Sequence, residues 1–280
     1  MTKCFYDKEK YPAYDLLKSF RRSLLKNDNF IKVTDFGAGS RVFSSDKRKI
    51  SAVAKNAGIS RKRAKLLYRL VNYLECKNVL ELGTSLGIAT SAMAANKSTN
   101  VLTVEGCPET ANIAQQQFDR FGLNNNIQMK IGKFEDALEE VVGGKWKEES
   151  ESGLRNQEKG GKRRQRGEWK VERENKKEKR EEQTAGGETN NNLQTTNYNL
   201  VFFDGNHQKQ PTLEYFHKLL PAAKNNSVFI FDDIHWSPEM EEAWEEIKKH
   251  PEVTVSIDTF YWGLIFFRIE QAKQHFVIRL

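Results

Sequence analysis

From residue 78 onward, short apolar runs alternate with helical stretches, and this alternation constrains the fold more than any other feature of the sequence. The runs expected to be strands are NVLEL, NVLTVE, IQMKIG, YNLVFFD and SVFIFDD, and helical patterns separate them. Parallel neighbours in a sheet need crossover connections. The alternation therefore predicts an α/β fold with a parallel sheet and helices on both faces.

Two further strands, VTVSID and WGLIFFR, are expected near the C-terminal end. About three residues, TFY, join them, which is too short for a crossover connection. We therefore expect an antiparallel hairpin at the sheet edge. The whole pattern predicts a Rossmann-like, mostly parallel sheet of seven strands that ends in this hairpin.

Helical patterns also precede the first strand, at about residues 11–26, 47–57 and 61–75. Ser60 is the expected N-cap of the third helix. The sequence thus predicts a helical cap over residues 1–75 and a second unit over residues 76–280. VTDFGAGSR, at 33–41, is either a glycine-rich connection between helices or a loop that covers a ligand.

Charge is distributed unevenly along the chain. Residues 143–197 contain 14 Lys or Arg and 11 Asp or Glu with almost no apolar residue, which predicts a disordered insertion. This stretch contributes 14 − 11 = +3 of the net charge of +7 and leaves +4 for the remainder. Charge alone therefore does not argue for a nucleic-acid partner.

VLELGTSLGIAT, at 79–90, fits two incompatible patterns. G-x-S-x-G could be the turn that presents Ser85 as the nucleophile of a hydrolase. It could also be a glycine-rich turn beneath a nucleoside cofactor. The hydrolase interpretation is disfavoured because no oxyanion-hole segment and no strand pair are expected before residue 78. The cofactor interpretation predicts an acid at the end of the next strand to bind ribose hydroxyls, and Glu105 occupies that position.

The motifs ELGTSLG, TVEG, FFDGNH and FDD follow one another in order. With the terminal hairpin, they make residues 76–268 resemble class I S-adenosylmethionine-dependent methyltransferases, and most of all the catechol and caffeoyl-CoA O-methyltransferase group with its bacterial relatives. The resemblance implies that S-adenosylmethionine is the cofactor and that a small-molecule hydroxyl is methylated. The cofactor-binding residues that it implies are Glu81, Gly83, Thr84, Ser85, Gly87, Glu105, Phe134 and Asp204. Phe134 could instead be a core residue.

Metal-dependent members of that group hold Mg²⁺ with an Asp after the fourth strand and an Asp-Asn pair after the fifth. The resemblance places Asp204, Asp232 and Asp233 at these positions, with Asp233 where the group has Asn. Hard oxygen ligands suit Mg²⁺. Alternatively, Asp204 contacts the methionine part of the cofactor and Asp232 only ends its strand.

The group also has a catalytic Lys three residues after the fourth-strand Asp, and this chain has His207 there. A His can accept a proton from a hydroxyl near neutral pH, so His207 is the expected base. His235 is a second candidate, and either could be a metal ligand or a loop residue. Trp236 and Trp262 are expected either to line an aromatic substrate pocket or to pack in the core.

Residues 50–70 offer a different function, because they resemble a helix-turn-helix. Arg61, Lys62, Arg63 and Lys65 could contact phosphates or bases, which would indicate a nucleic-acid-binding protein or a nucleic-acid methyltransferase. The tetrapeptide N/D-P-P-Y/F of base-amino methyltransferases does not occur in the sequence. A nicotinamide-dependent dehydrogenase is disfavoured by the terminal hairpin.

The N-terminal residues lack the apolar segment of a signal peptide, and no run is long enough to span a membrane. Cys4, Cys76 and Cys107 have no disulfide or metal spacing, so we expect reduced thiols and a cytoplasmic protein. A homodimer is a further expectation.

Overall fold

The computed structural model describes residues 2–34, 36, 45–142 and 197–279. The predicted disordered insertion, apart from residue 197, and most of the VTDFGAGSR loop lie outside the described residues. Within the described ranges, no helix is long and apolar enough to cross a membrane.

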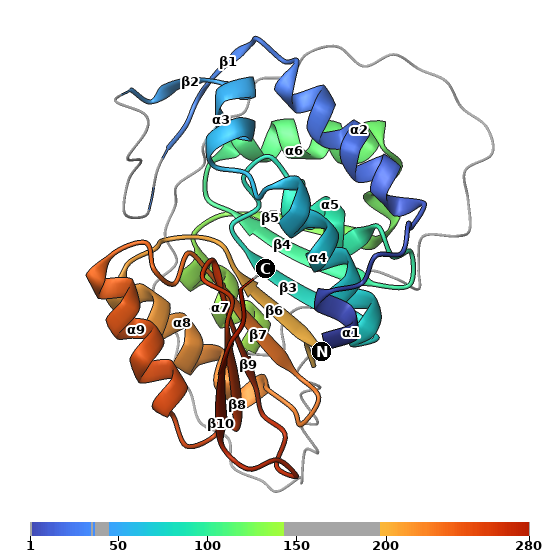
Figure 1. The fold of residues 1–280 in the computed structure, drawn as a ribbon. Coiled ribbons are helices and arrows are strands. Elements are labelled where there is room, and N and C mark those ends of the chain that lie inside the picture. Colours follow the sequence, from blue (N-terminus) through green and yellow to red (C-terminus); the bar gives the residue numbers. More distant parts are fainter. Residues whose placement is uncertain (1, 35, 37–44, 143–196, 280) are drawn as a thin grey trace, which may run out of the picture.

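An eight-stranded sheet forms the centre of the molecule, in the order β10-β8-β9-β7-β6-β3-β4-β5 (Figure 1). The strands are β3 (Asn78–Leu82), β4 (Asn100–Glu105), β5 (Ile127–Ile131), β6 (Leu200–Phe203), β7 (Val228–Asp232), β8 (Val255–Asp258), β9 (Trp262–Phe266) and β10 (Gln274–Val277). From β5 to β7 every neighbouring pair is parallel. The predicted five parallel strands are confirmed. Their carboxyl ends therefore meet at one edge of the sheet.

The C-terminal strands differ from the prediction in two respects. β8 and β9 form the expected antiparallel pair, but β9 lies inside the sheet, between β7 and β8. All five residues of β9 are buried, as an interior strand requires. The sheet also has an eighth strand, because β10 adds parallel to β8. All four β10 residues are exposed, so the strand has no apolar face that the sequence could have revealed.

Helices cover both faces of the sheet (Figure 1). One layer consists of α2 (Ala13–Leu25), α3 (Ile50–Asn56), α4 (Arg61–Tyr73), α5 (Ile88–Ala94) and α6 (Pro108–Arg120), and α1 (Thr2–Phe5) contacts α4. The other layer consists of α7 (Phe134–Val142), α8 (Lys209–Leu219) and α9 (Pro238–Lys249). Leu67, Met93 and Phe118 belong to the first core and Phe216 and Trp244 to the second. The cap helices thus share a core with the sheet.

The N-terminal region contains a strand pair that the sequence did not indicate. β1 (Phe30–Lys32) and β2 (Lys47–Lys49) pair antiparallel, and α3 starts only at Ile50 instead of residue 47. Each strand has three residues, too few for a visible alternation. The Ser60 cap of α4 is confirmed, since its side chain accepts a hydrogen bond from the Arg63 N–H at 3.2 Å.

Candidate functional site

A cavity of about 530 Å³ opens at the carboxyl ends of β3, β4, β6 and β7. Its walls come from the glycine-rich loop after β3, from Glu105 at the end of β4, and from the segments that follow β6 and β7. The cap closes it from the opposite side with residues of α3 and with Arg63 of α4. The volume is in the range of small-molecule sites, ~300–1,000 Å³, and the position is the one that open α/β sheets use for ligands.

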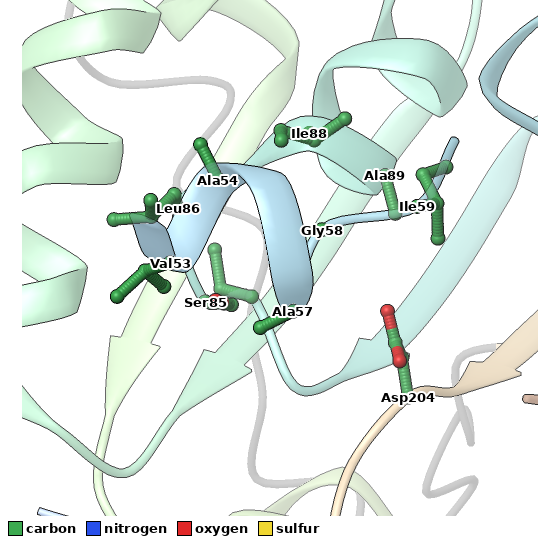
Figure 2. A pocket seen from close by; sticks show the side chains of 11 residues that line it. Val53, Ala54, Ala57, Gly58, Ile59, Ser85, Leu86, Ile88, Ala89 and Asp204 are labelled. Atoms are coloured by element: carbon green, nitrogen blue, oxygen red, sulfur yellow. The ribbon is translucent and has the colours of Figure 1, made fainter. Parts of the chain in front are cut away.

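The glycine-rich loop has a backbone that only glycine adopts easily at two positions. Gly83 has φ +109°, and a Cβ there would be 2.2 Å from the carbonyl oxygen of Asp204. Gly87 has φ +78°, and a Cβ there would be 2.5 Å from the Phe118 ring. Figure 2 shows Val53 of α3 and Ala57, which follows α3, close to Ser85 of the loop. The loop is thereby held between the sheet and the cap.

Ser85 is placed as a loop residue and lacks the partners of a nucleophile. Its backbone has φ +48°, and its N–H donates to Glu105 Oε2 at 2.7 Å. Among the described residues, no histidine is hydrogen-bonded to the Ser85 hydroxyl. The arrangement therefore lacks the serine–histidine pair that a hydrolase needs.

Glu105 is oriented by two backbone amides. Its Oε1 accepts from the Cys107 N–H at 2.8 Å and its Oε2 from the Ser85 N–H at 2.7 Å. A carboxylate oxygen can accept more than one hydrogen bond, and Glu105 lines the cavity. The geometry fits a ligand with two adjacent hydroxyls, as a ribose has.

Glu81 and Thr84 support the glycine-rich loop from the side facing the protein interior and do not line this cavity. Glu81 is fully buried and accepts from the Thr90 and Thr103 hydroxyls, while the Thr84 hydroxyl lies 2.6 Å from that of Thr103. Burial raises the pKa of Glu81 to about 7, against the opposing effect of the two hydroxyls. Glu81 Oε1 has no partner among the described residues. This oxygen is enclosed by the protein and does not line the cavity.

Phe134 begins α7 and both packs and lines the cavity. Its ring meets that of Tyr215 edge to face at 5.7 Å, and a Cβ on Gly205 would be 2.7 Å from Phe134 Cε2. The two interpretations of Phe134 therefore do not exclude each other: one side of the ring packs, and the residue still contributes to the cavity wall.

Asp204, Asp232 and Asp233 come together at the same end of the cavity, with His207 and Trp236. The pKa of Asp204 is raised well above its ordinary value, first by burial and then by the Asp232 carboxylate. The His207 and Trp236 rings lie 6.0 Å apart. A proton acceptor and an aromatic side chain thus line the wall next to the carboxylates.

Arg63 is the most important cavity residue whose role the sequence did not indicate. Its Nη1 lies 3.0 Å from Asp232 Oδ1 and 3.4 Å from Oδ2, and its guanidinium carbon lies 4.9 Å from the centre of the Tyr261 ring. Both oxygens of Asp232 thus face a cation that the protein itself supplies. The described residues contain no group of three His, Cys, Asp or Glu arranged to hold a metal. As they stand, the predicted ligands do not fit a divalent ion.

The basic segment at 50–70 is only partly available to a nucleic acid. Arg63 points into the cavity, and the Lys65 ammonium lies 4.4 Å from the centre of the Tyr14 ring. Arg61 and Lys62 are exposed. α4 packs against α5 and α2, so it is a cap helix whose inward basic residues have partners within the chain.

His235 and Trp262 lie outside the cavity. His235 bridges Glu241 at 2.9 Å and Asp258 at 3.0 Å, and stacks on Phe260. Trp262 is 1% exposed and meets Phe202 edge to face. Of the two histidines and two tryptophans considered, only His207 and Trp236 line the cavity.

A hydrogen-bond chain that the sequence did not reveal supports the segment after β6. Asn206 has φ +64° and donates from Nδ2 to the Tyr215 hydroxyl at 3.1 Å. Tyr215 donates to Glu135 Oε1 at 2.6 Å. The asparagine in DGNH was the one available signal, because Asn tolerates positive φ better than most residues. This chain fixes the backbone between Asp204 and His207.

The parallel sheet and the cavity at its carboxyl edge define a Rossmann-like architecture, and comparison with known proteins shows similarity to methyltransferases. Residues 45–152 match the model of the O-methyltransferase family. A catechol O-methyltransferase of the bacterium Niastella koreensis is 37% identical over 86 residues, which are 30% of this chain and 39% of that protein. The alignment thus spans well under half of the relative. The resemblance that the sequence motifs indicated is confirmed over this part.

Solved structures extend the likeness of the fold to almost the whole chain. The SAH-bound methyltransferase PaMTH1 of Podospora anserina has a TM-score of 0.55 at 11% identity, covering 95% of this chain and 92% of that one. The O-methyltransferase TomG of Streptomyces achromogenes, in complex with SAM, has a TM-score of 0.51 at 13% identity, covering 92% and 91%. The predicted methyltransferase fold is confirmed.

Proposed function

We propose that this protein transfers the methyl group of S-adenosylmethionine to a hydroxyl oxygen of a small-molecule acceptor. The observation that carries the proposal is the 2.7 Å hydrogen bond from the Ser85 N–H to Glu105 Oε2. It joins the glycine-rich loop to the carboxylate that we assign to the ribose hydroxyls, and both line the same wall of the cavity. The O-methyltransferase match over residues 45–152 supports the same activity.

When bound, S-adenosylmethionine supplies a methyl group on a positively charged sulfur. Glu105 would accept hydrogen bonds from both ribose hydroxyls, and the loop at 83–87 would lie along the methionine part. Phe134 would pack against the adenine.

The acceptor would bind at the end of the cavity formed by Asp204, His207 and Trp236. His207 would accept the proton of the acceptor hydroxyl, and Trp236 would provide an apolar wall that keeps water from the reacting oxygen. The backbone between Asp204 and His207 is fixed by Asn206, which reduces the motion of the base.

The finer expectations from the sequence stay predictions. A divalent ion on Asp204, Asp232 and Asp233 is one of them, and the contacts of Arg63 speak against it. The cytoplasmic location and the homodimer are others. Cys4, Cys76 and Cys107 are free and buried, which is compatible with reduced thiols.

The test is a binding measurement followed by a turnover screen. Calorimetric titration of S-adenosylmethionine into the wild type, Glu105→Ala and the exposed control Glu139→Ala should show binding that only Glu105→Ala loses. A screen of catechols and other hydroxylated aromatics should then yield S-adenosylhomocysteine and a methyl ether. Absence of binding to the wild type would overturn the proposal. Retention on heparin at moderate salt would instead favour the nucleic-acid alternative.

A further inference from the structure

Arg63 is built into the acceptor end of the cavity by three independent contacts. Ser60 caps the first turn of α4 through the Arg63 N–H, which holds the backbone from which the side chain extends. Asp232, which is 5% exposed, binds Nη1 with both oxygens. The guanidinium lies over the Tyr261 ring. A buried carboxylate needs such a partner, and an arginine held on an aromatic face keeps one orientation.

The Arg63 guanidinium has N–H donors that are not used in its contact with Asp232. Only Nη1 donates to Asp232, and Nε and Nη2 have no hydrogen-bond partner among the described residues. Arginine carries five N–H donors and stays charged at every accessible pH. Because Arg63 lines the cavity together with Asp204 and His207, its remaining donors can reach a ligand oxygen there.

We propose that Arg63 is the resident cation of the acceptor site and binds the acceptor oxygen as its proton leaves, so that methyl transfer requires no divalent metal. This inference rests on the proposed function. The hydroxyl proton passes to His207, the oxygen forms the new bond to the methyl carbon, and the bond from that carbon to the cofactor sulfur breaks. Arg63 neutralises Asp232 throughout and donates to the developing oxyanion, as preorganised donors do elsewhere.

The same argument specifies the acceptor. A guanidinium stabilises an oxyanion by charge and hydrogen bonds but does not form the direct oxygen–metal bond with which a Lewis acid promotes ionisation. The acceptor hydroxyl must therefore be acidic in its own right. Phenols meet this condition, since the phenol of Tyr ionises near pH 10, whereas aliphatic alcohols do not. We expect phenols to be methylated and matched aliphatic alcohols to be inert.

The first experiment titrates Mn²⁺, as a spectroscopic substitute for Mg²⁺, into the wild type and Arg63→Gln, and follows free Mn²⁺ by electron paramagnetic resonance. The wild type should not bind Mn²⁺ in a 1:1 complex. Arg63→Gln leaves Asp232 without its cation and should form a 1:1 complex, with an affinity at least about tenfold above any weak binding of Mn²⁺ to the wild type. Absence of that gain would also contradict the inference. Arg61→Gln, an exposed arginine of the same turn, should behave as the wild type. Tight 1:1 binding to the wild type that Asp232→Asn removes would overturn the inference.

The second experiment measures phenol methylation with EDTA or with Mg²⁺. Wild-type turnover should be the same in both, and Arg63→Gln should lose on the order of 100-fold in kcat with unchanged calorimetric affinity for S-adenosylmethionine. Arg63→Lys should recover part of the loss, and serves also if Arg63→Gln does not fold. Turnover that EDTA abolishes, or that survives in Arg63→Gln, contradicts the inference. Failure to bind S-adenosylmethionine contradicts the proposed function instead.

Discussion

The backbone N–H of Ser85 donates to Glu105 Oε2 at 2.7 Å, so the loop after β3 and the carboxylate of the last residue of β4 form one unit. Their two strands are adjacent and parallel, which brings the two segments to the same edge of the sheet. A change at Glu105 therefore affects the loop as well as the ligand.

Replacement of Glu105 should lower the affinity for S-adenosylmethionine, and Glu105→Ala should lower it more than Glu105→Gln. Glu105→Gln keeps one acceptor and should cost about tenfold, whereas Glu105→Ala removes both and should cost about 100-fold or more, as hydrogen bonds to charged groups contribute ~1.5–3 kcal/mol each. Isothermal titration calorimetry measures both variants. Equal affinities for Glu105→Ala and the wild type would exclude a ribose contact.

His207→Gln should reduce kcat by about 100-fold, because a positioned general base contributes ~10²–10⁴-fold. The affinity for S-adenosylmethionine should not change, since His207 lies at the acceptor end of the cavity. The exposed His217→Gln is the matched control. If the two variants turn over at the same rate in a steady-state assay, His207 is not the base.

Gly87→Ala should destabilise the fold more than Gly122→Ala. Both glycines have positive φ, +78° and +66°, which costs an L-residue ~1–2 kcal/mol. A Cβ at Gly87 would in addition lie 2.5 Å from the Phe118 ring, whereas nothing lies within 4 Å of one at Gly122. Urea unfolding of both variants should show an extra loss for Gly87→Ala of about 1–3 kcal/mol from overpacking. Equal losses would mean that Phe118 moves aside.

Glu81 should make the stability of the ligand-free protein depend on pH. Its pKa is raised to about 7 from 4.5, so the folded state binds more protons than the unfolded state between these values. Stability therefore falls as pH rises from 4.5 to about 7, by up to about 3 kcal/mol. Glu81→Gln should lack this part of the fall. Urea unfolding at pH 5.5 and pH 8 measures the difference, and parallel curves for the two proteins would contradict it.

The sequence predicted the strands from β3 to β9 because they are short apolar-rich runs with clear boundaries, and all of them except β5 are largely buried. The three-residue connection predicted that β8 and β9 are antiparallel, but connection length does not determine where a hairpin enters a sheet, so the interior place of β9 was missed. β10 was missed because its residues are exposed. The hydrophobic pattern of a strand indicates which of its residues are buried. The order of the strands in the sheet depends on packing between segments that are distant in the sequence.

In the candidate site, too, local features were predicted from the sequence and long-range contacts were not. Glu105 was found because consecutive parallel strands place its carboxylate at a fixed spacing from the loop. Arg63 was noticed only as one of several basic residues, since nothing local distinguishes a guanidinium that pairs with Asp232, 169 positions away, from one in solvent. The hydrogen bond of Asn206 to Tyr215 was missed because the asparagine in DGNH indicates at most a positive φ and not a partner nine residues away.

The family match ends at residue 152, whereas β6 starts at Leu200 and β7 at Val228. Within the described residues, the match therefore contains Ser85, Glu105 and Arg63 but not Asp204, His207 or Asp232. The similarity in sequence thus covers the part of the chain to which we assign the cofactor. The strand ends to which we assign the acceptor have to be compared in three dimensions.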